Sequence, residues 1–413
     1  MIQWTEQHEM MRDAIRRFIE AEIVPHIDEF EHGDTPPYDV LRKMFRAFGI
    51  DEVARERFRS QIEREKRAAA GEVPAAAAES RKAAGGPEAA DNLAMQLIPT
   101  IELCRYCPGM VTAMGVSVGL TSAAIMSKGT TAQKERWALD LLTLDKVGSW
   151  AITEPGSGSD AFGGMKSTAK RDGDGYVLNG SKTFITNGPY ADTIVFICRL
   201  DEGNPHAERK VLTFVLDRGT PGLEQSRPVR KMGMHSSPTG DLFLSDVRVG
   251  KDQLLGESEN LASRSGAKDT FGSERTGVAA MALGIVEECL RLCIEYARTR
   301  VAFGRAIGEF QLIQLKLAKM EVARMNIQNM VFRQIELAAA GIKPTFAEAS
   351  AMKLYSAQAA MDVCLESVQL HGGNGYMSEF RVEQLCRDAK VLQIYAGTDE
   401  IQVSQIARSL LAG

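Results

Sequence analysis

The sequence has little that marks a secreted, metal-dependent or disulfide-stapled protein. Its seven cysteines are scattered and odd in number, which argues against a disulfide framework and favours a reducing compartment. Cys104 and Cys107 have C-x-x-C spacing, but no second pair or nearby histidine pair completes a zinc site. Cys289 and Cys293 lie one helical turn apart, which is typical of core packing. We therefore expect no metal.

The chain also lacks an excess of positive charge and a long apolar run. Its 49 basic and 54 acidic residues give a net charge of −5, and the pI is about 5.8, which argues against a nucleic-acid partner. The N-terminus shows no basic region followed by an apolar stretch, and no run of about 18 apolar residues is present. These observations predict a soluble, cytoplasmic protein that does not interact with membranes.

The first 147 residues predict a helical domain. Ile15, Phe18, Ile19 and Ile23 recur at helical spacing within 5–48. Residues 51–67 are charged and compatible with a helix. Residues 68–90 hold eleven alanines and almost no large apolar side chain, so we expect either a mobile insertion or a loosely held helix within an Ala-rich insertion over 51–90. Helical character returns over 91–147.

Residues 148–250 predict a β-barrel or β-sandwich domain. Asp172-Gly173, Asp174-Gly175, Asn179-Gly180 and Asn187-Gly188 punctuate short apolar runs, and such dipeptides are strong hairpin signals. Strand-like runs follow over 193–198, 211–216 and 242–249. From about residue 274 the period returns to 3.6, so residues 251–413 predict a four-helix bundle. The order of helical domain, β domain and bundle predicts an α+β multidomain fold without βαβ alternation.

Gly156-Ser-Gly158-Ser-Asp-Ala161 matches a dinucleotide-binding pattern, but Pro155 precedes it and hairpin signals follow, so we expect no NAD site. The longer string Trp150 to Asp160 is rich in small residues. Such a loop can be a structural turn, or it can approach a flat cofactor or its phosphates closely.

Four further strings are each compatible with packing alone or with a ligand. Phe184-Ile-Thr186-Asn-Gly ends a strand. Arg300-Val-Ala-Phe303-Gly, with Gln311 behind it, presents an arginine at a turn. Gln369-Leu-His-Gly-Gly373 follows a helix and can cap it. Ile394-Tyr-Ala-Gly-Thr398 leads into a helix whose first N–H groups are free for an acceptor.

In this order and spacing, the set resembles the acyl-CoA dehydrogenase family over nearly the whole chain. The resemblance rests on Thr153-Glu-Pro-Gly, Gly158-Ser-Asp, Ile185-Thr-Asn-Gly, Arg300, Phe303-Gly, Gln311, Gly372-Gly-Asn-Gly, Arg387-Asp-Ala-Lys and Gly397-Thr. It implies a flavoprotein with FAD in a cleft between the β domain and the bundle. It also implies that Arg300 and Gln311 come from one subunit, that Gln369–Gly373 come from another, and that the protein is a homotetramer.

The resemblance assigns residues to the cofactor and to the thioester. The implied FAD contacts are Trp150, Ile152, Thr153, Gly158, Ser159, Phe184, Ile185, Thr186, Arg300, Phe303, Gln311, Gln369, Leu370, His371, Gly372, Gly373, Thr398, Asp399 and Glu400. The implied substrate contacts are Ser159, Gly272, Ser273, Arg275, Tyr395, Ala396 and Gly397.

The catalytic base needs a separate argument. Many family members carry a glutamate directly after the Tyr of the Tyr-x-Gly-Thr string, where this chain has Ala396. A smaller group, including the isovaleryl- and long-chain enzymes, carries it before the Arg of the first bundle helix, where this chain has Glu274 before Arg275. The resemblance therefore implies that Glu274 removes the α proton of an acyl-CoA. The other interpretation of Glu274 is an acid favoured by a helix N-terminus.

The resemblance also implies the remaining parts of the reaction. The Ala396 N–H would hold the thioester carbonyl, and an electron-transferring flavoprotein would reoxidise the flavin. Two departures from the family pattern are visible. Phe184 stands where Trp is common, which should alter the packing on the flavin, and residues 51–90 replace a shorter segment that helps build the acyl pocket, which affects the substrate. Two other functions stay open, a flavin monooxygenase or oxidase on the same fold and a DNA-associated flavoprotein. The net negative charge and the absence of a C-terminal extension argue against the latter.

Overall fold

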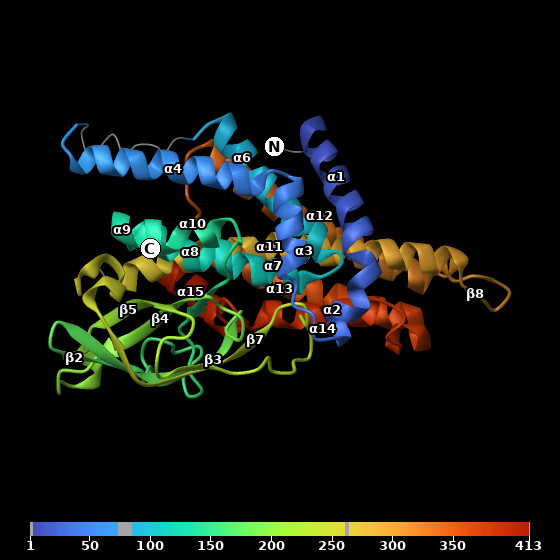
Figure 1. Ribbon diagram of the computed structural model, residues 1–413. Coiled ribbons are helices and arrows are strands. Elements are labelled where there is room, and N and C mark those ends of the chain that lie inside the picture. Colours follow the sequence, from blue (N-terminus) through green and yellow to red (C-terminus); the bar gives the residue numbers. More distant parts are fainter. Residues whose placement is uncertain (1–2, 73–84, 261–263, 413) are drawn as a thin grey trace.

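The structure is a computed structural model that describes residues 3–72, 85–260 and 264–412, with side chains over 264–273 left undescribed. It contains an N-terminal helical domain, a middle sheet and a C-terminal helical bundle, as the sequence predicts (Figure 1). The N-terminal elements are α1 (Glu6–Glu22), η1 (Val24–His26), α2 (Ile27–His32), α3 (Tyr38–Ala47), α4 (Ile50–Ala69), α6 (Pro87–Cys104), α7 (Pro108–Met114), η3 (Gly115–Thr121), α8 (Ser122–Lys128), α9 (Thr131–Gln133), η4 (Lys134–Ala138) and α10 (Leu139–Leu142).

The charged segment after residue 50 forms α4, which extends along one side of the molecule (Figure 1). Phe58 and Ile62 bury its inner face against Trp137 and Leu141, so this helix is anchored at its middle. Residues 73–84 of the Ala-rich insertion lie outside the described residues. The end of the insertion is docked rather than loose, because the Gly86 N–H donates to the Ala339 carbonyl at 2.6 Å.

The apolar helical segment Pro108–Lys128 meets a length and composition test for a membrane span. The sequence shows no run of about 18 apolar residues, so this helix differs from the expectation that no segment could span a membrane. Its middle portion, η3, is a π-helix, and its start packs into the main core through Met110 and Val111. Core helices of soluble proteins pass the same test, so the observation is weak evidence for a membrane.

The middle of the chain forms a seven-stranded mixed sheet in the order β1-β4-β2-β3-β7-β6, with β5 pairing with β4. Strands β1 and β2 run parallel to β4, and the other pairs are antiparallel. The strands are β1 (Gly148–Ala151), β2 (Thr168–Asp172), β3 (Gly175–Thr186), β4 (Thr193–Leu200), β5 (Val211–Asp217), β6 (Leu223–Gln225) and β7 (Thr239–Val249), with the short helices η5 (His206–Glu208), η6 (Lys251–Gln253) and η7 (Leu255–Glu257).

Two hairpin predictions are wrong. Asn187-Gly188 makes a turn between β3 and β4, but these two strands do not pair with each other. Asn179-Gly180 does not turn the chain but lies inside the long strand β3, at a bulge in its pairing with β7. The Asn179 side chain pairs with Asp246 on β7 in both directions, and a Cβ on Gly180 would meet Ser167 Oγ at 2.2 Å. Glycine is therefore required here by close strand packing.

Strand β4 is buried along its whole length because both faces of the sheet are covered there. Phe196 faces the core inside the sheet, while Val195 packs with Trp137 from the N-terminal helices. Asn187 then fastens the end of β3 to three other elements, α3, α7 and β1: its Oδ1 accepts from Tyr38 Oη at 2.9 Å, and its Nδ2 donates to the carbonyls of Ala113 and Gly148 at 2.9 Å. These contacts fix the β domain against the helices.

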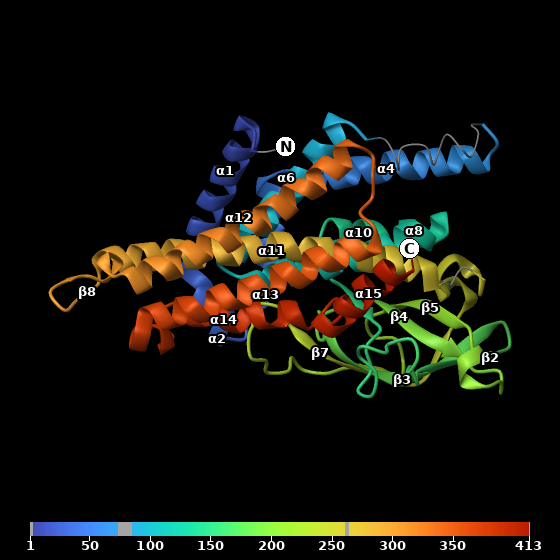
Figure 2. The same ribbon diagram turned by 180° about the vertical axis from the view of Figure 1, so that it is seen from behind.

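The C-terminal bundle shares one large apolar core with the N-terminal helices. The start of α11 and helix α15 lie over the sheet, and the β8–β9 hairpin projects from the far end of the bundle in both views (Figures 1 and 2). The elements are α11 (Arg264–Thr299), β8 (Val301–Ala302), β9 (Arg305–Ala306), η8 (Ile307–Glu309), α12 (Gln311–Ala339), α13 (Phe346–His371), η9 (Gly372–Tyr376), α14 (Val382–Lys390), η10 (Val391–Gln393) and α15 (Asp399–Leu411).

Candidate functional site

Glu274 lies within α11 rather than at its start. The helix begins at Arg264, about three turns earlier, so the interpretation of Glu274 as an acid favoured by a helix N-terminus is wrong. Burial raises the pKa of Glu274 to about 7, although Arg275 and Lys353 oppose the shift. A carboxyl group with this pKa can exchange a proton near neutral pH. Gly272 and Ser273 precede it on the helix, but their side chains lie outside the described residues.

Arg275 joins Glu274 to the Tyr395–Thr398 turn. Its Nε donates to the Ala396 carbonyl at 3.3 Å, and its Nη1 donates to Ser350 Oγ at 3.0 Å. The guanidinium carbon lies 4.1 Å from the centre of the Phe346 ring. The structure therefore brings Arg275, and with it the adjacent Glu274, to the Tyr395–Thr398 turn.

The Tyr395–Thr398 turn has an unusual backbone. Ala396 has φ +53° and Gly397 has φ +91°. A non-glycine residue in the left-handed region is uncommon and often marks a functional site. Tyr395 Oη contacts Met281 Sδ at 3.1 Å, and burial raises the pKa of Tyr395 well above its usual value. Tyr395 is therefore a neutral wall of this site.

Helix α15 follows the turn. Thr398 is its N-cap residue, but the Thr398 side chain makes no capping bond to the backbone of the first turn. Asp399 is tied by Lys353, Gln358 and Gln393, each at 3.2–3.3 Å, so its carboxylate is structural. The pKa of Glu400 is lowered by its own backbone N–H and the Thr398 hydroxyl.

The Trp150–Asp160 loop is built on a buried ion pair that the sequence analysis misses. Lys182 Nζ lies 2.8 Å from Glu154 Oε1 and donates to the Ile152 carbonyl at 3.1 Å. The Glu154 carboxylate also accepts from the N–H groups of Lys166 and Ser167. No local pattern in the sequence indicates this pair, because Lys182 stands among polar neighbours, Ser181 and Thr183.

This scaffold exposes some predicted residues and buries others. Gly158 and Ser159 are exposed, Trp150, Thr153 and Thr186 are half-buried, and Ile152 and Ile185 are buried. Phe184 is 71% exposed and has φ +57°, although it lies in a strand between buried neighbours. A large uncovered ring held in a left-handed conformation is a suitable surface for stacking.

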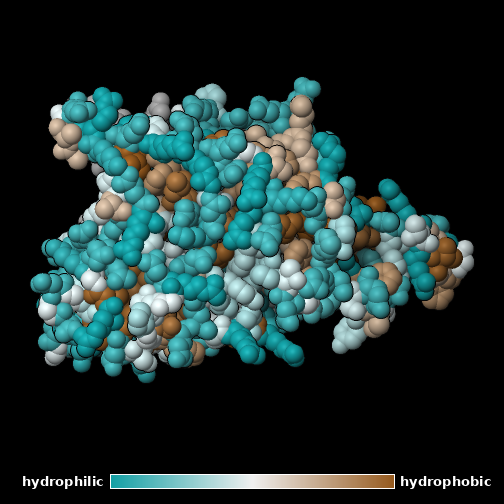
Figure 3. Space-filling model, in the orientation of Figure 1, coloured by the Kyte–Doolittle hydropathy of each residue, from teal (hydrophilic) through white to brown (hydrophobic). Residues whose placement is uncertain are grey.

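A second group of predicted residues lies at the other end of the bundle. Phe303, at the tip of the β8–β9 hairpin, is 95% exposed with φ +52°, and Arg300 and Gln311 are also exposed. Among the described residues, the Arg300 guanidinium meets no carboxylate. Apolar atoms gather at the tip of this projection (Figure 3).

Gln369–Gly373 adjoin that second group. His371 stacks on Tyr296 with ring centres 4.3 Å apart, and Tyr296 lies one turn before Arg300. The expectation that Arg300 and Gln369–Gly373 come from different subunits therefore conflicts with the geometry, because one chain presents both sets together. Leu370 and His371 also point into the core, so only their backbone atoms can meet a ligand; Gln369, Gly372 and Gly373 are exposed.

Flavin adenine dinucleotide, the cofactor that the resemblance implies, fits these two groups. The first group offers an exposed ring, small residues and free N–H groups, and the second offers an unpaired guanidinium and exposed glycines. Figures 1 and 2 place them at opposite ends of one chain, so a single chain does not assemble both around one cofactor.

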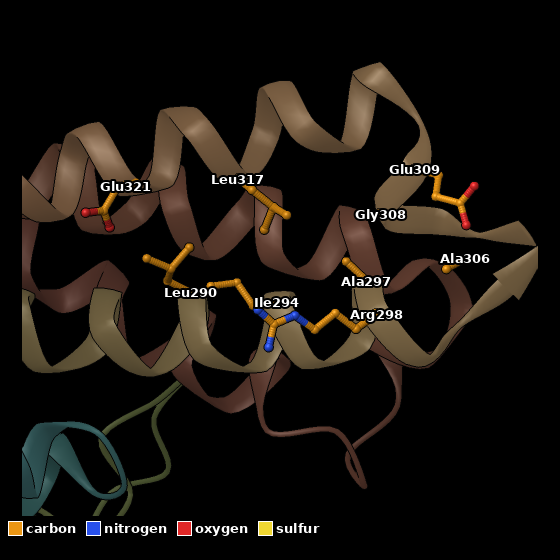
Figure 4. Close-up of a pocket in the computed structure, with 9 residues that line it drawn as sticks. All are labelled: Leu290, Ile294, Ala297, Arg298, Ala306, Gly308, Glu309, Leu317 and Glu321. Carbon is orange, nitrogen blue, oxygen red and sulfur yellow. The ribbon is translucent and has the colours of Figure 1, made fainter.

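A cavity of about 600 Å³ opens between α11 and α12 near the hairpin (Figure 4). None of the predicted site residues lines it, and its walls are mainly aliphatic. We do not associate it with the chemistry. Its lining residues are Leu290, Ile294, Ala297, Arg298, Ala306, Gly308, Glu309, Leu317 and Glu321.

Comparison with known proteins gives matches along the chain. Family models described as the acyl-CoA dehydrogenase N-terminal, middle and C-terminal domains match residues 5–51 and 39–145, 149–247 and 265–411. The chain is 36% identical over 333 residues to a short-chain-specific acyl-CoA dehydrogenase of Megasphaera elsdenii, covering 81% of this chain and 85% of that protein.

Two further proteins match nearly end to end. The chain is 32% identical over 415 residues to the caffeyl-CoA reductase-Etf complex subunit CarC of Acetobacterium woodii, covering 99% of both chains. The solved structure of an acyl-CoA dehydrogenase from Geobacillus kaustophilus superposes with a TM-score of 0.84 at 33% identity, covering 98% of both chains.

Proposed function

The chain belongs to the acyl-CoA dehydrogenase family, FAD-dependent oxidoreductases that act on the CH–CH bond of acyl-CoA thioesters, and from this premise we propose that Glu274 is its catalytic base. The observation that carries the proposal is the position of the half-buried Glu274 beside the turn at Ala396, where the alternative glutamate is missing; loss of solvation there raises the pKa of Glu274 to about 7. FAD, when bound, supplies the hydride acceptor of the reaction.

The base works with a backbone donor on the neighbouring turn. The Ala396 N–H has no hydrogen-bond partner among the described residues, while the Ala396 carbonyl is held by Arg275. An N–H directed at the thioester carbonyl stabilises the negative charge that develops when Glu274 removes the α proton. Glu274 becomes neutral in that step, and its negative charge passes to the thioester, so the net charge of the site stays the same. Tyr395 and Gly397 line the thioester, and Ser159 contacts the pantetheine chain.

The cofactor is held by two chains in this proposal. Trp150, Phe184 and Thr186 of one chain surround the flavin ring, with Ile152, Thr153, Gly158, Ser159, Ile185, Thr398, Asp399 and Glu400 beside it. A partner chain supplies Arg300, Phe303, Gln311 and Gln369–Gly373. An exposed guanidinium suits a pyrophosphate, and an exposed ring suits an adenine.

We further propose a cytoplasmic homotetramer that acts without a membrane or nucleic-acid partner and passes electrons to an electron-transferring flavoprotein. The relative named as part of a caffeyl-CoA reductase-Etf complex supports the last point. That name also describes reduction, so the same site can work in the direction of saturation when electrons are supplied.

The decisive experiment is anaerobic titration of the purified FAD-bound protein with acyl-CoA thioesters. The panel contains straight, branched and aryl-substituted chains, from short to long. Loss of the oxidised-flavin absorbance with one class establishes dehydrogenation and names the substrate class. If no thioester has this effect but the protein consumes oxygen with another reductant, the proposal fails in favour of an oxidase.

A further inference from the structure

The Tyr395–Thr398 turn is held by its carbonyl groups while its N–H groups stay free. Gln402 Nε2 donates to the Ala396 carbonyl at 3.1 Å and to the Gly397 carbonyl at 2.7 Å. No hydrogen bond from the N–H of Ala396 or Gly397 occurs within the described ranges. The turn is therefore oriented from one side and leaves its donors on the other.

Gln402 is well placed to hold this orientation. It lies in the first part of α15, and its own N–H donates to the Thr398 carbonyl at 3.0 Å. Its side chain is fully buried, so bulk water does not reach the two carbonyls from this side, and its Oε1 accepts no hydrogen bond among the described residues. A Cβ on Gly397 would approach Gln402 Nε2 to 2.8 Å, which shows how closely the amide packs under the turn.

Arg275 approaches the same Ala396 carbonyl from α11. Its guanidinium is fixed by Ser350 and by the Phe346 ring, and the Ser350 hydroxyl in turn donates to the Phe346 carbonyl at 2.8 Å. Arg275 follows Glu274 directly in α11. Its hydrogen bond to the Ala396 carbonyl therefore links the helix that carries the proposed base, Glu274, to the turn that carries the proposed donor, the Ala396 N–H.

From this geometry we propose that Gln402 is a positioning residue for dehydrogenation, which fixes the left-handed backbone of Ala396 so that its N–H meets the thioester carbonyl. The inference rests on the proposed function. Gln402 touches neither the base nor the substrate in this proposal and acts through the turn. The carbonyls of Ala396 and Gly397 accept three hydrogen bonds, and two of them come from the Gln402 amide. Without that amide, the backbone that has φ +53° at Ala396 is held by Arg275 alone on this side. A displacement of about 1 Å in such a donor can cost about a hundredfold in rate.

The first test replaces Gln402 with methionine, which keeps the length of the side chain and removes its donor. Gln405→Met is the matched control, since Gln405 is a half-buried glutamine one turn later on the same helix. In the FAD-bound enzyme, we expect Gln402→Met to lower both kcat and the exchange of α protons with deuterated solvent by about tenfold to a hundredfold. FAD content, oligomeric state and the dissociation constant of the acyl-CoA should stay close to wild type.

A second variant distinguishes positioning from packing. Gln402→Glu can donate to the carbonyls only when its carboxyl is protonated, so its activity relative to wild type at the same pH should rise as the pH falls. A purely structural defect would give a ratio that does not change with pH. The control Gln405→Met should behave as wild type at each pH.

Each outcome decides whether Gln402 positions the turn for catalysis or only stabilises the fold. Wild-type rates of proton exchange in Gln402→Met, or a pH-independent ratio for Gln402→Glu, would overturn the positioning role, and so would loss of the fold in both variants. If wild-type enzyme itself neither exchanges α protons nor reduces its flavin with any acyl-CoA, the proposed function fails instead.

Discussion

Glu274 has a raised pKa because its carboxyl is buried, and this sets the pH dependence of the reaction. The base must be ionised to accept a proton, and its pKa is about 7. On the acidic side of the pH profile, we therefore expect kcat/KM to rise with pH up to about 7 and then to level off. Stopped-flow flavin reduction at a series of pH values measures the limb directly. A midpoint close to the ordinary glutamate value would contradict the role of burial.

Glu274→Gln removes the base with almost no change of shape. We expect kcat to fall by about 10²- to 10⁴-fold while FAD stays bound. Glu295→Gln is a suitable control, because Glu295 lies on the exposed face of the same helix and pairs with Arg291. Turnover of Glu274→Gln within a few-fold of wild type would require a different base.

The same substitution should stabilise the protein. The folded chain holds a proton on Glu274 up to pH about 7, whereas the unfolded chain loses it near its ordinary value of 4.5. The wild type therefore loses stability as the pH rises through this window, and glutamine does not. The melting temperature of Glu274→Gln should exceed that of wild type at pH 8 and match it near pH 4.5. The buried position that raises the pKa of the base therefore lowers the stability of the folded protein at neutral and alkaline pH.

The sequence predicts the residues of the reacting end better than their surroundings. Glu274 follows from the missing glutamate at 396 and the glutamate before Arg275. The burial that raises its pKa depends on side chains from other elements and is not visible in a single string. Gln402 is missed for the same reason, because its two acceptors lie on a turn whose left-handed φ is set by packing.

At the level of elements, the loop between β1 and β2 depends on the Glu154–Lys182 pair. Burial alone would raise the pKa of Glu154, but the Lys182 ammonium and the hydrogen bonds outweigh it and hold the pKa below its usual value. Lys182→Met leaves a buried carboxylate unpaired, which typically costs about 3–5 kcal/mol. Urea denaturation should show this loss together with weaker FAD binding.

Two further variants test the origin of that loss. The double variant Glu154→Gln with Lys182→Met removes both charges and should recover much of the stability. Lys166→Met is the control, since Lys166 contributes only its backbone N–H to Glu154 and its side chain is exposed. If the double variant is no more stable than Lys182→Met, lost packing rather than the charge explains the effect.

The strands also show where local patterns stop being informative. The runs at 193–198 and 211–216 become β4 and β5 because apolar β-branched and aromatic residues dominate them. Asn179-Gly180 has the same local signal as a true hairpin turn, but β7 and Ser167 lie against it and the chain continues straight. Tertiary contacts overrule the dipeptide preference at that position.

On the scale of the whole molecule, a buried acidic cluster joins the three parts of the chain. Glu31 from α2 lies near Asp388 and Arg387 from α14 and near Lys231 and His235 from the segment before β7. The Glu31 side chain is 2% exposed, and its carboxylate accepts no hydrogen bond within the described residues. Burial, reinforced by Asp388, raises its pKa to about 8 against the opposing effect of Arg387.

This cluster predicts that Glu31→Gln is stabilising at high pH. Between pH 4.5 and about 8 the unfolded wild-type chain releases a proton that the folded chain keeps, so wild-type stability falls across the window. The melting temperature of Glu31→Gln should therefore exceed that of wild type by a growing margin up to pH about 8. Glu29→Gln, an exposed neighbour on α2, should show no such margin.

The division of the cofactor residues between the two ends of the chain predicts complementation between inactive variants. The sequence predicts both groups but not their separation, because the distance between them depends on the length of the bundle. In our proposal, Arg300→Ala damages the cofactor site of the partner chain, and Glu274→Gln damages the site of its own chain. Each variant alone is inactive.

When equal amounts of both variants assemble together, some cofactor sites combine an intact Glu274 with an intact Arg300 from the partner chain. For random pairing this holds for about a quarter of the sites in the unselected mixture, so about a quarter of wild-type activity should return there, and slightly more in tetramers that carry both tags. The two variants are co-expressed with different tags, and the hybrid is isolated by tandem affinity. A hybrid as inactive as its parents would mean that Arg300 serves the cofactor site of its own chain. A conformational change would then have to bring the two ends of the chain together. The fold does not favour such a change, because the N-terminal helices and the bundle share one continuous apolar core.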